Sequence, residues 1–102
     1  MKASEYFEKY FANVKSLEEL CQNGKAMFKD MLDEFFEIEK KRKPKTKDAI
    51  VGIVRELNDK WNSVATKVEK KFSTKVVKRN VIWNALLSEN KDFGNEFPRK
   101  PD

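Results

Sequence analysis

The most concentrated chemistry in this chain is a run of cationic side chains, KKRKPKTK, at residues 40–47. Lysine and arginine at this density neutralise phosphate groups, so the run predicts contact with a DNA or RNA backbone, or a nuclear-type basic address. It also suits a solvated hinge whose lysines complement the negative C-terminal end of a preceding helix. The candidate binding residues are the six cations of this run and a second patch further along the chain: Lys40, Lys41, Arg42, Lys43, Lys45, Lys47, Lys78 and Arg79.

Two acidic segments form a second candidate site. DEFFE at residues 33–37 is followed, eighteen residues later, by ELND at residues 56–59. This spacing resembles the paired acidic motifs of the MazG-type nucleoside triphosphate pyrophosphohydrolases, with Asp33 where the family's first pair opens on glutamate. The resemblance implies a magnesium-dependent enzyme whose metal ligands, oxygen donors suited to a hard cation, would be Glu34, Glu37, Glu56 and Asp59. Helical phase turns Glu37 and Glu56 away from the apolar stripes of their helices, so we expect instead a protein without catalytic residues, metal or cofactor.

The composition narrows the possible chemistry. Histidine is absent, which excludes imidazole bases, Ser-His or Cys-His nucleophile pairs and histidine-ligated metals. The single cysteine, Cys21, has no partner for an internal disulfide and fits a reducing interior. The charged N-terminus does not read as a secretory signal, and no apolar run approaches the ~18 residues of a membrane span. These features predict a soluble, cytoplasmic protein with no membrane partner.

Two long amphipathic helices must position the charged residues. The first, over about residues 16–41, opens on a capping box formed by Ser16 and Glu19 and keeps its apolar stripe in phase across Gly24, which favours one continuous helix. The second, over about residues 46–72, begins at the N-cap candidate Thr46. Its apolar stripe recurs every three or four positions and consists of Ile50, Ile53, Val54, Leu57, Trp61, Val64, Ala65, Val68 and Phe72. The short connection predicts an antiparallel hairpin.

Shorter elements flank this hairpin. Aromatic residues at helical spacing predict a helix from Ala3 to Asn13 that covers a small core. A last helix carrying Trp83 starts either near Lys75 or, if the preceding valines are extended, near Asn80. Residues 89–102 contain Gly94, Pro98 and Pro101 and predict an irregular or partly ordered tail. The expected fold is an all-α bundle in a single domain, residues 1–88, built on the long hairpin.

Two features of the hairpin, an aromatic side chain and a row of lysines, each have two interpretations. Phe36 lies off the main stripe of the first long helix and is expected in a wider buried arc shared with Leu32, the alternative being an exposed contact for a partner. Lysines on one flank of the second long helix, Lys60, Lys67 and Lys71, either follow a nucleic-acid backbone or face the acidic flank of the first. Residues 1–39 carry a net charge of −4 and residues 40–102 a net charge of +9, which favours internal pairing.

These patterns together indicate a non-enzymatic binding module with a basic contact surface. Nucleic acid is the leading ligand class, and an acidic protein surface is the competitor. A protein–protein adaptor, or a structural accessory protein of a phage or other mobile element with no nucleic-acid role, is the alternative function.

Overall fold

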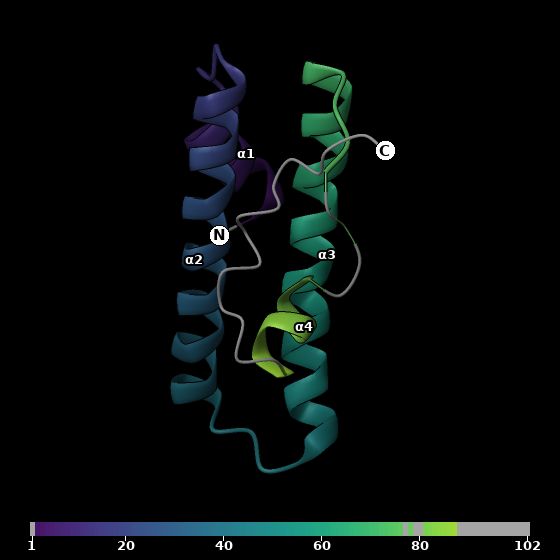
Figure 1. Ribbon diagram of the computed structural model, residues 1–102. Helices are drawn as coiled ribbons and strands as arrows, with labels where there is room; N and C mark the ends of the chain where they lie inside the picture. The colour runs from purple at the N-terminus through teal and green to yellow at the C-terminus, as the bar shows by residue number, and fades with distance from the viewer. Residues whose placement is uncertain (1, 77, 79–80, 88–102) are drawn as a thin grey trace.

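The computed structural model describes residues 2–76, 78 and 81–87, and within these residues the chain forms four α-helices and no β-strand (Figure 1). The helices are α1 (Ala3–Phe11), α2 (Leu17–Arg42), α3 (Lys47–Phe72) and α4 (Val81–Leu87). Helices α2 and α3 run antiparallel and form the predicted hairpin. The all-α class and the order of the elements are therefore confirmed, whereas the predicted tail at 89–102 lies outside the described residues.

Side-chain caps explain where the two long helices begin. The Ser16 hydroxyl accepts a hydrogen bond from the backbone N–H of Glu19 at 3.1 Å, and the Thr46 hydroxyl accepts one from the N–H of Ala49 at 3.2 Å. Each cap satisfies one of the amides that a helix start leaves without a backbone partner. Helix α2 continues through Gly24, which is buried, as the unbroken phase of its apolar stripe predicted.

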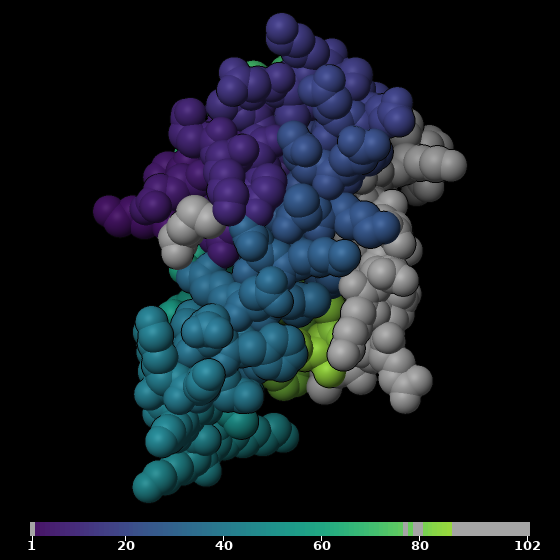
Figure 2. Space-filling model, turned by 90° about the vertical axis from the view of Figure 1, so that its left-hand side faces the viewer, coloured from purple at the N-terminus to yellow at the C-terminus, as the bar shows by residue number. Residues whose placement is uncertain are grey.

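The two short helices cover opposite faces of the hairpin. In Figure 1 α1 lies behind α2 and α3, whereas α4 lies in front of them. Figure 2, turned by 90°, shows the same two helices on either side of α2. Helix α1 packs against the half of the hairpin remote from the connection between α2 and α3, and α4 packs nearer to that connection. Each short helix thereby completes the core of one half of the hairpin.

The core is continuous through all four helices. Trp61 of α3 lies near its middle with 1% of its surface exposed, and Phe28 of α2 meets the indole edge to face at a centroid distance of 5.9 Å. Tyr6 and Phe11 of α1 are buried in the same cluster, so the N-terminal aromatics cover the core as expected. Ile82 of α4 is also fully buried.

Helix α4 begins at Val81, next to the later of its two predicted starts, near Asn80, and not at the earlier one, near Lys75. Its second residue, Ile82, donates its backbone N–H to the side-chain oxygen of Asn58 in α3 at 2.9 Å. Before the helix, Val76 is buried and donates its N–H to Glu69 at 3.1 Å. A short helix that starts near residue 80 is thus confirmed, and α3 supplies one of its N-terminal hydrogen-bond acceptors.

The prediction for Phe36 is wrong. Its side chain is 50% exposed and meets only the edge of the buried neighbour Phe35 among the aromatic contacts of the described residues. Besides its main apolar stripe, α2 is covered by α1 on the flank that carries Asp30 and Glu34. Phe36 lies on the flank that faces away from α1, because residues 34 and 36 point in nearly opposite directions on a helix.

Candidate nucleic-acid interface

The connection between α2 and α3 has a fixed backbone geometry. Lys43 closes α2 in the left-handed conformation, with φ 46° and ψ 59°, and its N–H donates to the carbonyl of Glu39 at 2.9 Å. Pro44 follows with its restricted φ, and Thr46 then caps α3. The cap at each end leaves a connection of only four residues, 43–46, which turns the chain back on itself.

All six predicted cations of residues 40–47, which we call the basic bend, are exposed. In Figure 2 the side chains around the bend project from the lower end of the molecule. The segment holds no acidic residue. Arg42 has an ion pair with Glu56 at 3.7 Å, but both side chains are more than half exposed, so the pair is weak. Within the described residues no other cation of the bend is in an ion pair, and the bend therefore presents a concentrated positive charge to solvent.

The second predicted patch is not part of this surface. Lys78 forms an ion pair with Glu69, in the last turns of α3 and at the end of the hairpin remote from the bend. This pair neutralises the Lys78 charge locally. Arg79, the other member of the patch, lies outside the described residues.

The lysines on the flank of α3 contact the other two helices of that half of the bundle. Lys60 donates to Glu34 of α2 at 2.9 Å, which confirms the predicted pairing of the two long helices at this position. Lys71 donates to the carbonyl of Ala12 at 3.2 Å and lies over the ring of Phe7, and Lys67 lies over the same ring. These lysines therefore contact α1 as well as α2. The charge pattern predicted only the contact with the acidic residues of α2.

The four carboxylates of the MazG-like alternative are not brought together. Glu34 accepts hydrogen bonds from Tyr6 and Lys60, and Glu56 is paired with Arg42. Glu37 and Asp59 are exposed. Across residues 2–76, 78 and 81–87 no three acidic or cysteine side chains are grouped so that they could hold a metal ion. Glu34 instead joins three helices.

Helix α1 is attached to α2 through two tyrosine–carboxylate pairs. The Tyr6 hydroxyl donates to Glu34, and the Tyr10 hydroxyl donates to Asp30, which also accepts from Lys9 at 3.0 Å. Burial acts to raise the pKa of Glu34, but the bonds from Tyr6 and Lys60 outweigh it and lower that pKa. The bond from Tyr10 likewise lowers the pKa of Asp30. Both carboxylates are thus favoured in their charged form.

We expect the fold to lose stability in acid. A carboxylate whose pKa is lower in the folded chain than in the unfolded chain stabilises the fold above the unfolded value, about 4, and this contribution disappears as the pH falls through the folded value. The urea midpoint, followed by circular dichroism, should therefore fall between pH 6 and about pH 2.5. The loss should be smaller in Tyr6→Phe, which lacks the hydroxyl that lowers the pKa of Glu34, and unchanged in Glu8→Gln, an exposed carboxylate of α1. An identical pH dependence in Tyr6→Phe would contradict this assignment.

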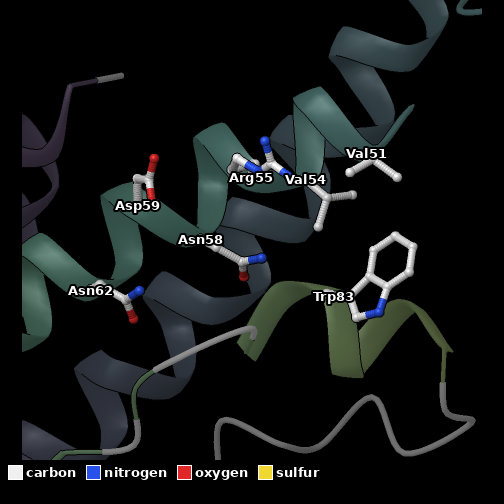
Figure 3. Close-up of a pocket in the computed structure, with 7 residues that line it drawn as sticks. All are labelled: Val51, Val54, Arg55, Asn58, Asp59, Asn62 and Trp83. Atoms are coloured by element: carbon white, nitrogen blue, oxygen red, sulfur yellow. The ribbon is translucent and has the colours of Figure 1, made fainter. Parts of the chain in front are cut away.

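A cleft of about 380 Å³ lies between α3 and α4, and Figure 3 shows the side chains around it. Sequence analysis did not find this cleft because its walls come from helices whose relative placement is tertiary. The one signal in the sequence was Asn58, a polar residue in phase with the apolar stripe of α3. In the structure its side chain is buried, with 7% of its surface exposed. We call this feature the Trp83 cleft, and the residues that line it are Val51, Val54, Arg55, Asn58, Asp59, Asn62 and Trp83.

Among the residues that the structure describes, no helix is both long and apolar enough to cross a membrane. The chain matches no protein-family model, no curated protein and no solved structure.

Proposed function

We propose that this chain is a small non-enzymatic binding module that contacts the phosphate backbone of nucleic acid with its basic bend. The observation that carries the proposal is the exposure of all six cations in a segment of eight residues without an acidic side chain. Lys60 and Lys78, by contrast, are paired with Glu34 and Glu69 within the bundle. Among the described residues the bend is the densest run of exposed cations.

The geometry of the bend supports phosphate binding. The left-handed cap at Lys43 and the side-chain cap at Thr46 end and begin the two long helices with only four residues between them, so the cations lie within a small region. A set of fixed cations displaces the counterions of a nucleic acid, and the release of these ions drives binding without regard to sequence.

A protein adaptor that binds an acidic surface is the second candidate function. The observation that favours it is the half-exposed ring of Phe36, which lies one turn before the bend on the flank of α2 that faces away from α1. Exposed aromatic side chains are enriched in protein interfaces. A duplex presents no unstacked base to such a ring, so a contribution of Phe36 to the binding of a protein partner without nucleic acid would favour the adaptor.

A salt titration tests the proposal. Fluorescence anisotropy of a labelled 12-nucleotide single strand and a 12-base-pair duplex would be measured from low to physiological salt. If all six cations of the bend contact phosphates, a plot of log affinity against log salt should have a slope of about −4 for the single strand and about −5 for the duplex. No detectable binding at low salt, or an affinity that salt does not change, would overturn the proposal.

A further inference from the structure

We propose that the nucleic acid bound by the basic bend is single-stranded, and that one of its unpaired bases enters the Trp83 cleft and stacks on Trp83. This inference rests on the proposed function of the bend and adds to it the class of nucleic acid and a second contact. It is carried by the composition of the cleft, by the orientation of Asn58 and by the position of the cleft relative to the bend.

One side of the cleft suits a flat apolar surface. Val54 is buried and Val51 partly buried, and in Figure 3 the indole of Trp83 extends from α4 towards these two residues. Trp83 is itself only partly buried, so part of its surface stays accessible at the cleft. Aromatic rings in such a position are the usual stacking partners of unpaired bases, and they accept every base because each has a π-face.

The deep part of the cleft offers polar groups to the edge of a base. The oxygen of the Asn58 carboxamide accepts the N–H of Ile82, which fixes the orientation of the amide. In Figure 3 the amide nitrogen points instead towards the side of the cleft where Val54 and Trp83 lie. An amide N–H held in this way is a donor for the ring nitrogens and carbonyl oxygens that bases carry on their edges.

The cleft lies where a strand on the bend can reach it. Arg55 lines the cleft from an exposed position two turns after Lys47, which is about 12 Å along the axis of α3. Phosphates that contact the bend and then Arg55 would place the intervening nucleotide beside Trp83. A base within a duplex is stacked and paired, so only an unpaired base presents both a face and an edge to this cleft.

A comparison of two oligonucleotides tests the inference. One is a 12-nucleotide oligo-dT, and the other has the same phosphates with abasic residues at every position. Anisotropy should show the wild-type protein binding oligo-dT about 5-fold or more tighter than the abasic strand, as expected for one stacked base. The variant Trp83→Leu, which keeps an apolar side chain but removes the ring, should bind both strands with the lower affinity.

Matched variants separate stacking from folding. Trp83→Phe retains an aromatic ring and should restore at least part of the preference for oligo-dT. Circular dichroism and urea unfolding would establish that both variants are folded at the assay temperature. If Trp83→Leu does not fold, Arg55→Ala, an exposed substitution at the cleft, should still reduce the affinity for oligo-dT more than the affinity for the duplex.

The possible outcomes distinguish this inference from the proposed function. Equal binding of the two strands by the wild type, or a preference for oligo-dT that survives in Trp83→Leu, would overturn the base contact and leave the phosphate contact of the bend intact. Absence of binding to any of the nucleic acids would overturn the proposed function, and the base contact with it.

Discussion

Replacement of Trp61 by alanine is expected to lower the free energy of unfolding by about 3–5 kcal/mol. The indole is 1% exposed and packs edge to face on Phe28, so its removal leaves a cavity between α2 and α3 at the centre of the core. Neighbouring Leu57 and Val64 are fully buried, and close packing on all sides limits how far the cavity can collapse. For a domain of this size, whose total stability is of the order of 5–15 kcal/mol, the loss is a large fraction of the whole.

Urea unfolding followed by circular dichroism would measure this loss. The control is Phe36→Ala, which removes an aromatic ring of comparable kind from a position that is 50% exposed and should cost less than about 1 kcal/mol. If Trp61→Ala shows no unfolding transition, its loss of stability equals or exceeds the free energy of unfolding of the wild type, which is the upper limit of the expected effect. Similar losses in the two variants would show that Trp61 does not lie at the centre of the core.

Charge reversal at the basic bend should produce the largest change in binding. In the triple variant Lys41→Glu, Arg42→Glu and Lys43→Glu, three cations that can contact phosphates are lost. With a contribution of about 0.7 to the salt slope from each contact on a single strand, affinity near 0.1 M salt should fall on the order of 100-fold. The salt slope itself should become less steep by about 2. Anisotropy with the oligonucleotides described above measures both quantities.

The control for this variant has the same net charge. Lys15, just before α2, and Lys25 and Lys29, in its first half, are exposed and lie away from the bend. Their replacement by glutamate changes the formal charge from +5 to −1, as the bend variant does. A specific contact predicts that only the bend variant loses most of its affinity. Equal losses in the two triple variants would indicate attraction to the overall charge of the protein, and the bend would not be the binding surface.

The long helices were predictable because their signals are local. Ser16 and Thr46 cap the helices with their own side chains, and the apolar stripe of α2 keeps its phase through Gly24, so both elements follow from nearby residues. The start of α4 was left between two positions because one of its N-terminal bonds goes to Asn58, which is 24 residues earlier in the chain. Local sequence does not specify such a bond.

The site was predictable to a similar extent. The charge density of the bend is a property of consecutive residues, and the exposure of its lysines follows from their position at a helix connection. Phe36 was misplaced because periodicity identifies the main buried stripe of a helix but not which flank a neighbour covers. Helix α1 packs on the flank with Asp30 and Glu34, because the hydroxyls of Tyr6 and Tyr10 donate hydrogen bonds to these carboxylates.

Helix α4 is docked on α3 in part through the hydrogen bond from the backbone N–H of Ile82 to Asn58. A helix of seven residues is not stable by itself in water, so α4 keeps its conformation only while it is docked on α3. Because Val81, Ile82 and Ala85 of α4 belong to the same core as the other helices, detachment of α4 would expose apolar surface. Local unfolding of α4 would also remove the wall that carries Trp83, so the Trp83 cleft exists only while α4 is docked.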